Sequence, residues 1–154
     1  MTEQERRTLQ ETMVLPYAWS LGPVNTLFFK ELTDMKIMGT RCPRCSRVLV
    51  PARLFCPRCF IDLTEWVQVS DHGTIRTWTI INFSYAGQPK KPPYINAMIE
   101  LDGADTRIPH WVGGVDLSDL DKVKEQIGIG TRVKAVWKEK PEGLITDIEY
   151  FVPV

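Results

Sequence analysis

Two CPRC pairs contain all four cysteines of this 154-residue chain, Cys42 and Cys45 in the first pair and Cys56 and Cys59 in the second. Two residues between the thiols let a tight turn point both sulfurs at one ion, and two such turns complete the tetrahedral four-cysteine site that Zn²⁺ favours. A site of this kind has no open position for a substrate. The pairs therefore predict a structural Zn²⁺ site, whose binding energy helps to fold a segment too small to fold alone.

The four cysteines allow three other interpretations. Two disulfides would suit a small secreted domain, but the N-terminal sequence mixes charges throughout and has no apolar signal-peptide core. A redox CxxC of the thioredoxin kind normally occurs singly rather than in duplicate. Rubredoxin iron uses the same four ligands, and the spacing alone does not choose between iron and zinc. We expect a soluble, cytoplasmic metal-binding protein.

The chain around these cysteines is rich in positive charge, although the formal net charge of the whole chain is +0. Residues 35–61 include six basic side chains and no acidic one. The basic residues are Lys36, Arg41, Arg44, Arg47, Arg53 and Arg58. Part of this charge can balance a zinc tetrathiolate, whose formal charge is about −2. The remainder would form an exposed basic face, suited to phosphates, to nucleic acid or to an acidic partner surface.

The first part of the chain divides into three segments. Prolines and polar residues predict an extended arm at residues 1–24, in which the aromatic side chains of Tyr17 and Trp19 would contact a partner. Apolar residues at helical spacing predict a helix at residues 25–36. The zinc ribbon then follows at residues 37–63, as a knuckle, a hairpin and a second knuckle.

Residues 64–154 are rich in β-branched and aromatic residues, in six segments with partial alternation. These segments are residues 66–69, 73–81, 94–101, 106–112, 132–137 and 145–151. A charged stretch at residues 117–126, with Ser118 as its cap, predicts a short helix between the fourth and fifth of these segments. Five or six strands with one helix predict a small OB-fold barrel. The expected fold class is mainly β, with an N-terminal helix and a rubredoxin-like zinc ribbon before the barrel.

The order of these segments resembles the DUF35-like family of zinc-ribbon and OB-fold proteins that accompany thiolases. The resemblance covers residues 26–154. Besides the CPRC pairs, it rests on the segments Phe28–Leu32, Glu65–Val67, Gly73–Ile75, Pro92–Tyr94, Ile99–Asp102 and Ile129–Val133. It implies a small partner of thiolases, of hydroxymethylglutaryl-CoA synthase pairs, or of some aldolases and hydratases. It also points to the small subunits of benzoylsuccinyl-CoA thiolases, which act in the degradation of aromatic compounds.

The chain departs from the family directly after each CxxC pair. Many members have glycine there, where the knuckle can need a positive φ, whereas this chain has Ser46 and Phe60. We expect the metal ligands to be retained and the local turns to differ.

No catalytic residue emerges from the sequence. Thiolase chemistry needs a cysteine nucleophile with general bases, and every cysteine here is assigned to the metal. His72 lies in an Asp-His-Gly turn, and His110 lies in a strand with no identifiable acid or nucleophile to pair with. The chain is therefore expected to lack a complete active site.

Binding residues can be proposed in two places. The long segment at residues 83–93 contains Tyr85, Lys90 and Lys91, which would suit the adenine and phosphates of coenzyme A. The alternative is a solvated loop made rigid by its prolines. Arg44 and Arg58, together with the aromatic residues of the arm, are the candidate contacts to a partner protein.

Three functions remain open at this point. The favoured one is a non-catalytic, zinc-binding subunit that docks to a catalytic thiolase and assists with acyl-CoA binding or turnover. The second is a module that binds single-stranded nucleic acid, because OB barrels and zinc ribbons both commonly do so. The third is a stand-alone acyl-CoA carrier or enzyme. The acyl group, the direction of the reaction and the subunit ratio are not encoded in any motif.

Overall fold

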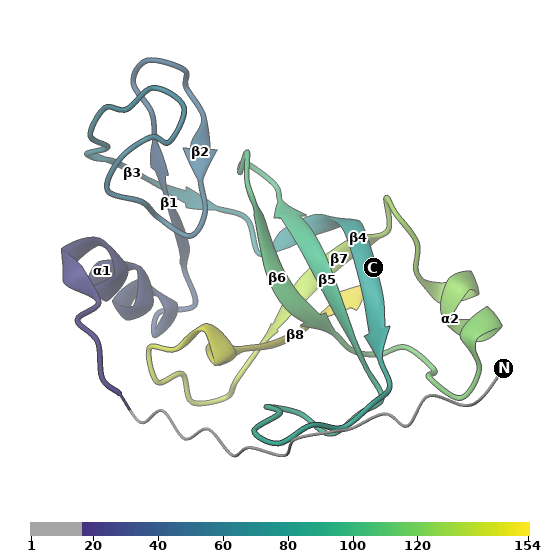
Figure 1. The fold of residues 1–154 in the computed structure, drawn as a ribbon. Coiled ribbons are helices and arrows are strands. Elements are labelled where there is room, and N and C mark those ends of the chain that lie inside the picture. Colours follow the sequence, from purple (N-terminus) through teal and green to yellow (C-terminus); the bar gives the residue numbers. More distant parts are fainter. Residues whose placement is uncertain (1–16) are drawn as a thin grey trace, which may run out of the picture.

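The computed structural model describes residues 17–154, and it divides into a helix, a small ribbon and a barrel (Figure 1). Most of the predicted arm, residues 1–16, lies outside the described residues. None of the helices in the described part is long and apolar enough to cross a membrane.

Helix α1 spans Gly22–Leu32, so it begins and ends earlier than the predicted range of residues 25–36. It begins early because Pro23 fits the first turn, where no backbone N–H is needed. It ends early because the chain turns at Met35, whose φ is 56°, in a left-handed conformation typical of helix ends. The buried face of the helix contains Phe28 and Leu32.

The ribbon contains a three-stranded antiparallel sheet in the order β2-β1-β3 (Figure 1). Its strands are β1 Ile37–Arg41, β2 Val48–Leu49 and β3 Glu65–Val69. We expected residues 66–69 to form a barrel strand, but β3 instead pairs with β1 along its whole length. The reason is that the two-residue β2 covers one edge of β1 and leaves the other edge free for a longer partner.

The barrel closes through five strands in the order β4-β5-β6-β8-β7, with β7 returning to β4. All neighbours are antiparallel except β6 and β8, which is the arrangement of an OB-fold. The strands are β4 His72–Ile81, β5 Tyr94–Leu101, β6 Arg107–Val112, β7 Arg132–Trp137 and β8 Ile148–Pro153, and a 3₁₀ turn, η1 Ile145–Asp147, leads into β8. The predicted fold class is confirmed.

The second helix, α2 Leu120–Gln126, lies within the predicted stretch of residues 117–126. It lies between β6 and β7, as predicted. The predicted cap, Ser118, is wrong, because the side chain of Asp119 accepts the hydrogen bond from the Asp121 backbone N–H. Asp119 has the extended backbone that a capping residue needs.

The ribbon and the barrel are joined by a shared core and by polar contacts. Val48 and Val50 of the ribbon belong to the same buried cluster as the barrel residues Ile99 and Leu101. The Val48 N–H donates to Asp105 Oδ2 at 2.8 Å, and the Asp105 N–H donates back to the Val48 carbonyl at 2.8 Å. The ribbon is therefore fixed on the turn between β5 and β6.

Candidate metal centre and binding surfaces

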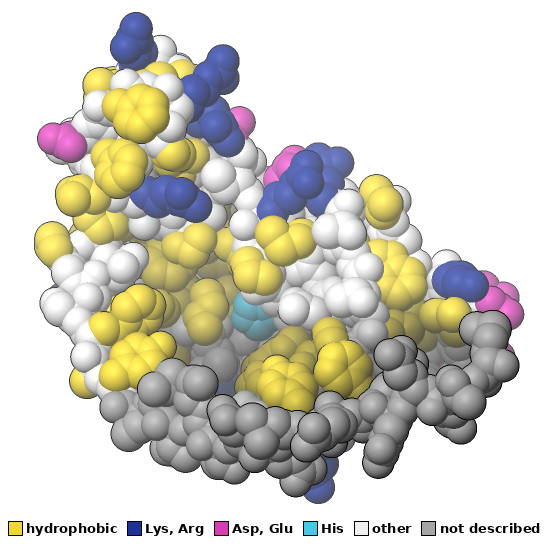
Figure 2. Space-filling model, in the orientation of Figure 1, with side chains coloured by type: hydrophobic (Ala, Val, Ile, Leu, Met, Phe, Trp, Pro, Cys, Tyr) yellow, Lys and Arg dark blue, Asp and Glu magenta, His cyan; other side chains and the backbone are white. Residues whose placement is uncertain are grey.

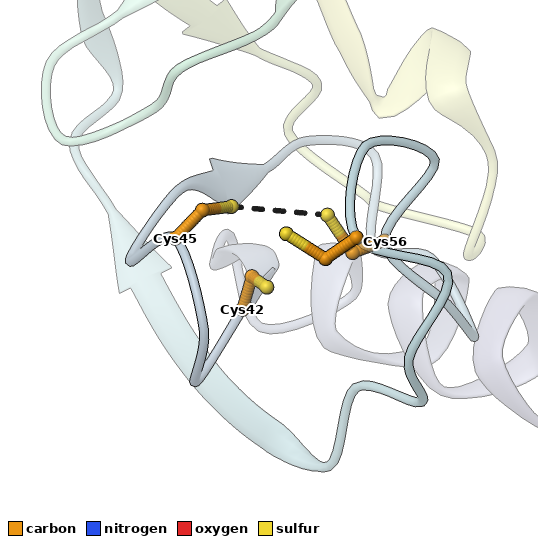
Figure 3. A group of neighbouring side chains, drawn as sticks. Cys42, Cys45 and Cys56 are labelled. Carbon is orange, nitrogen blue, oxygen red and sulfur yellow. Dashed lines mark hydrogen bonds between the residues drawn. The ribbon is translucent and has the colours of Figure 1, made fainter.

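The four cysteine sulfurs meet between the two knuckles of the ribbon (Figure 3). All four Sγ atoms lie within 4.8 Å of one another, and those of Cys45 and Cys56 are 3.8 Å apart. A tetrahedron with Zn–S bonds of about 2.3 Å has edges of about 3.8 Å. The cysteines are free thiols in a geometry that fits a single tetrahedral ion and not two disulfides.

The two knuckles have the same backbone geometry. In the first, the Ser46 N–H donates to the Cys42 carbonyl at 2.8 Å, and in the second the Phe60 N–H donates to the Cys56 carbonyl at 2.8 Å. Ser46 and Phe60 have φ values of 60° and 54°. The expectation that the local turns would differ was wrong, since both keep the left-handed residue that glycine would supply. The two side chains accept a backbone cost of about 1–2 kcal/mol each.

The protein environment treats the thiols unequally. Burial raises the pKa of the Cys42 thiol, but hydrogen bonds from the backbone N–H groups of Cys45 and Arg44 outweigh this effect and lower the pKa to about 7. Burial and the neighbouring sulfurs raise the pKa of Cys59 to about 12. The protein alone therefore favours the thiolate at Cys42 and the neutral thiol at Cys59, and a bound cation would favour the thiolate that a metal ligand needs.

Apolar side chains close the centre. Leu49 and Leu63 pack against the cysteines, with relative exposures of 0% and 4%. Because no position is left open for a substrate, the centre suits a structural Zn²⁺ rather than a catalytic one. The same four thiolates would also hold iron.

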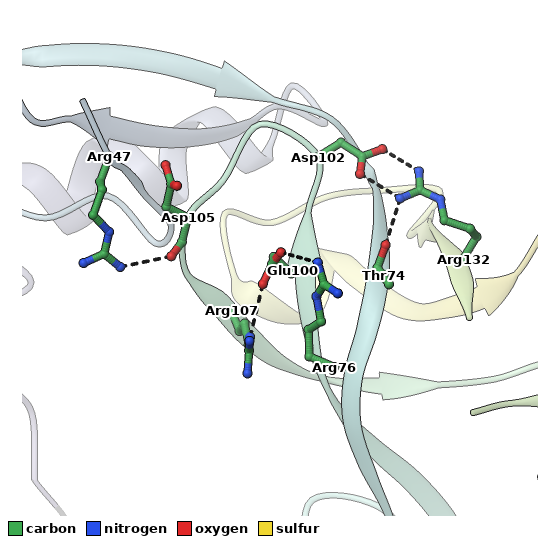
Figure 4. Close-up of polar contacts among 8 residues, drawn as sticks. All are labelled: Arg47, Thr74, Arg76, Glu100, Asp102, Asp105, Arg107 and Arg132. Carbon is green, nitrogen blue, oxygen red and sulfur yellow. Dashed lines mark hydrogen bonds and ion pairs between the residues drawn. The ribbon is translucent and has the colours of Figure 1, made fainter. Parts of the chain in front are cut away.

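The six cations around the cysteines fall into two groups. Three have partners: Arg41 pairs with Glu65 at 3.0 Å, Lys36 pairs with Asp34 at 3.7 Å, and Arg47 donates to the Asp105 carbonyl at 3.1 Å (Figure 4). The other three are exposed and form no ion pair within residues 17–154. These are Arg44, Arg53 and Arg58.

The two histidines have structural partners. His110 is buried, its Nδ1 accepts from the Trp111 N–H at 2.9 Å, and its Nε2 lies 3.3 Å from the Ile145 carbonyl. Burial lowers the pKa of His110, so the ring stays neutral and joins β6 to η1. His72 is the first residue of β4 rather than part of a turn, and its Nδ1 lies 2.8 Å from Asp71 Oδ1. In the described part of the chain, neither histidine has a thiol outside the metal centre to activate.

Two adjoining pockets form a groove on the barrel, called here the barrel groove. One has a volume of about 250 Å³ and the other about 300 Å³, and both are lined by Trp111 and Thr146. The further lining residues are Asn96, Pro109, His110 and Ile145 in the first, and Pro89, Lys90, Lys138, Glu149 and Tyr150 in the second. Figure 2 shows a histidine within a hollow bordered by hydrophobic side chains. OB-folds bind ligands on this face, between the second and third strands and the loops that flank them.

The barrel groove includes only one of the three residues predicted to contact coenzyme A. The ammonium group of Lys90 lies 5.4 Å from the centre of the Trp111 ring. Tyr85 is half-exposed beside Phe83, with ring centres 6.2 Å apart, and neither Tyr85 nor Lys91 lines the groove. Sequence reasoning missed Trp111 and Thr146 because they are far along the chain from residues 83–93. The OB topology was the signal that could have found them.

A buried carboxylate supports one wall of the barrel groove. Asp147 is fully buried and accepts hydrogen bonds from the backbone N–H groups of Glu142, Gly143 and Leu144 at 3.0, 2.7 and 3.0 Å. Burial raises the pKa of this carboxyl, but the three donors outweigh burial, and the pKa is lowered. The loop that contributes Ile145 is therefore fixed from beneath.

A second groove lies where α1 meets the ribbon. It has a volume of about 390 Å³, and Leu21, Val24, Ala52, Leu54 and Phe55 form much of its apolar wall. The predicted partner contacts Tyr17 and Trp19 precede α1 and are 81% and 78% exposed. Neither of them lines this groove.

Family profiles match two consecutive parts of the chain. Residues 29–65 match the rubredoxin-like zinc ribbon domain of ChsH2, and residues 66–138 match the C-terminal OB-fold domain of ChsH2. The boundary between the two matches lies within β3.

Two curated relatives are described as DUF35 domain-containing scaffold proteins. The one from Methanocaldococcus jannaschii is 29% identical over 123 residues, covering 77% of this chain and 82% of the relative. The one from Pyrococcus furiosus is 30% identical over 105 residues, covering 68% of this chain and 70% of the relative. A solved structure, titled Ltp2-ChsH2(DUF35) aldolase, contains a chain of similar fold. Its TM-score is 0.58 at 23% identity, covering 84% of this chain and 91% of that one.

Proposed function

Because the chain belongs to the DUF35 family of ChsH2-type proteins with a zinc ribbon and an OB-fold, we propose that it is the non-catalytic subunit of a thiolase-like complex. Its relatives are described as scaffold proteins, and the chain of similar fold comes from a complex of Ltp2 with a ChsH2 DUF35 protein. A scaffold needs a rigid body and free surfaces. The shared core of the ribbon and barrel supplies the first, and the exposed arginines and aromatics supply the second.

One observation supports this proposal above the others: every thiol belongs to the closed metal centre. A thiolase reaction requires a cysteine nucleophile that is free to attack an acyl group. This chain has none, and the ring nitrogens of its buried histidine are held by backbone groups. The thiolase chemistry would therefore come from a separate catalytic chain.

Reconstitution tests the proposal directly. The zinc-loaded chain is mixed with the purified thiolase-like protein encoded beside its gene, and the mixture is analysed by gel filtration with light scattering and by an acyl-CoA cleavage assay. We expect a stable complex and an activity that exceeds that of either protein alone. A thiolase that is fully active by itself and forms no complex would contradict the proposal, as would acyl-CoA turnover by this chain alone.

We further propose that the barrel groove contacts the coenzyme A part of the substrate. The flat face of Trp111 offers a stacking surface, and Lys90 places a positive charge beside it. The resemblance to benzoylsuccinyl-CoA thiolases suggests an aromatic acyl group, and the apolar end of the groove at Pro109 and Ile145 would suit one.

Binding measurements can separate this ligand from nucleic acid. Coenzyme A and a short single-stranded oligonucleotide are each titrated into the complex and into the free chain by calorimetry. We expect Trp111→Ala to weaken coenzyme A binding by about 10-fold or more, because stacking on an aromatic side chain contributes about 1–3 kcal/mol. Trp78→Ala, on β4 outside the groove, is the matched control. Salt-sensitive binding of the oligonucleotide, with no binding of coenzyme A, would favour the nucleic-acid function instead.

A further inference from the structure

Six exposed residues gather around the metal centre and are called here the knuckle face. They are Arg44, Arg53, Leu54, Phe55, Arg58 and Phe60. The three apolar side chains among them are 58%, 50% and 79% exposed, in the order Leu54, Phe55 and Phe60. Figure 2 shows hydrophobic and positively charged side chains interspersed over the ribbon. Large apolar groups at this level of exposure on so small a ribbon are typical of an interaction site.

The knuckle turn places residue 60 in a left-handed conformation, and a phenylalanine there carries a cost that its packing within the chain does not explain. Its φ of 54° lies in the left-handed region, where glycine or asparagine would cost less. Its ring is 79% exposed, so packing within the chain does not repay the cost. A strained residue that holds an aromatic ring in solvent points to a role for that ring in binding.

The loop beside Phe60 is also fixed before any partner arrives. The hydroxyl of the fully buried Thr40 accepts from the Arg53 N–H and donates to the Arg53 carbonyl, both at 2.9 Å. The Leu63 N–H donates to the Leu54 carbonyl at 2.8 Å, and Phe55 forms an isolated bridge with Asp62. Little conformational entropy would be lost when this loop binds another surface.

The charges of the knuckle face and the groove beside it indicate which kind of molecule this face would bind. Its three arginines form no ion pair within the described part of the chain, whereas Lys36 and Arg41 form ion pairs and Arg47 donates to a backbone carbonyl. The apolar groove of about 390 Å³, lined by Leu54 and Phe55, opens beside them. Arginines interspersed with aromatic rings can also bind single-stranded nucleic acid, but the adjoining groove is walled largely by aliphatic side chains, which suit an apolar side chain rather than a base or a phosphate. The face therefore fits a protein surface in which carboxylates surround an apolar side chain.

We propose that the knuckle face is the docking site for the catalytic subunit, and that it binds an acidic surface of that subunit with an apolar anchor at its centre. This inference rests on the proposed function and adds the position of the contact and the chemistry of the partner. Phe55 and Phe60 act as anchors, and the arginines orient the partner and speed its association.

Photo-cross-linking tests the position. Phe60→p-benzoylphenylalanine keeps an aromatic ring at the knuckle, and Leu120→p-benzoylphenylalanine places the same group on α2, where Leu120 is 51% exposed. With the purified thiolase-like subunit as the probe, we expect a cross-linked heterodimer from the Phe60 variant and none from the Leu120 variant. Cross-linking from Leu120 alone would overturn the inference.

Charge reversal tests the chemistry. The triple variant Arg44→Glu, Arg53→Glu and Arg58→Glu is compared with a triple variant of equal charge change on α2, β7 and the segment after β7, made by Lys124→Glu, Lys134→Glu and Lys140→Glu. We expect the ribbon variant to raise the Kd for the thiolase-like subunit by about 100-fold or more, because like charges in an interface cost several kcal/mol. The control should change the Kd by less than about 5-fold, and both variants should retain one zinc ion per chain.

The outcomes separate the two proposals. If the wild-type chain forms no complex, the proposed function and this inference are both overturned. If the wild-type complex forms and the ribbon variant binds as tightly, or the control weakens binding equally, only the knuckle face is overturned. Loss of binding to phosphatidylserine vesicles or to an oligonucleotide in the ribbon variant, with thiolase binding unchanged, would also overturn it, because the face would then recognise phosphates.

Discussion

The ribbon and the barrel both contain several arginines, but they use them differently. In the barrel, Arg76 and Arg107 both bind Glu100, at 2.6 and 3.2 Å, and Arg132 forms two hydrogen bonds with Asp102 (Figure 4). In the ribbon, half of the cations have no partner in the described part of the chain. The barrel pairs these three arginines internally, whereas the ribbon leaves the charge of three arginines available for another molecule.

The two regions also differ in what holds them together. The barrel has five paired strands and a continuous apolar core. The ribbon has one strand of only two residues, and a cysteine cluster stands in place of much of a core. A small segment of this kind depends on its metal. We infer that the bound ion stabilises the backbone of the ribbon. The ribbon can therefore keep residues that are strained and exposed to solvent.

Removal of the metal should have the largest effect and should separate the two regions. Structural zinc in small domains contributes about 10–16 kcal/mol to folding. We expect chelation, or Cys56→Ser, to expose the amides of residues 37–63 to hydrogen exchange while β4 to β8 stay protected. Mass spectrometry of peptide fragments would measure this. Protection that persists in the metal-free ribbon would show that packing against the barrel is sufficient.

A change at Asp147 should have the next largest effect, and it tests the barrel. Asp147→Ala leaves three backbone N–H groups without their buried acceptor, so we expect the free energy of unfolding to fall by about 2–3 kcal/mol. The folded-state pKa of this carboxyl is lowered. Its stabilising contribution is therefore present above the ordinary aspartate pKa of about 3.9 and is lost as the pH falls through the folded-state value. Urea unfolding of both proteins between neutral and acidic pH would measure this. A difference between them that is independent of pH would contradict the assignment.

Substitution of the two strained knuckle residues by glycine should have a smaller effect on stability. Phe60→Gly removes the left-handed strain at the second knuckle, and Ser46→Gly is the matched change at the first. We expect each to raise the stability of the zinc-loaded protein by roughly 0.5–1 kcal/mol, after the greater flexibility of glycine in the unfolded chain is taken into account. Only Phe60→Gly should weaken the complex with the catalytic subunit. Thermal unfolding and calorimetric titration would give the two values.

Opposite effects on stability and on binding are the informative result at Phe60. If Phe60→Gly destabilises the chain as strongly as a core substitution, the ring has a packing role and its strain has no functional meaning. If both glycine variants weaken binding equally, the knuckle backbone rather than the Phe60 ring makes the contact.

The metal ligands and the fold class could be predicted from the sequence, whereas the pairing of β3 and the barrel groove could not. The metal ligands follow from a local pattern, because the two CPRC turns contain all the geometry that the sulfurs need. The fold class follows from the order of the strands. The partner of β3 did not follow, because the free edge of β1 exists only in the assembled sheet. Trp111 and Lys90 meet only once the barrel closes, so the barrel groove could not be predicted from spacing.

The smallest changes in stability are expected when one charged side chain is neutralised in each region. Glu100 accepts hydrogen bonds from Arg76 and Arg107, and these bonds, although opposed by burial, lower its pKa. Glu100→Gln should therefore cost about 0.5–1 kcal/mol at neutral pH and low salt, and less in high salt, as for other partly exposed ion pairs. Arg44→Gln should leave the free energy of unfolding within about 0.5 kcal/mol of wild type, because Arg44 has no ion pair in the described chain to lose. Urea unfolding at two salt concentrations would compare them. A larger loss for Arg44→Gln would mean that this arginine stabilises the metal centre itself, and its charge would then no longer be available to a partner.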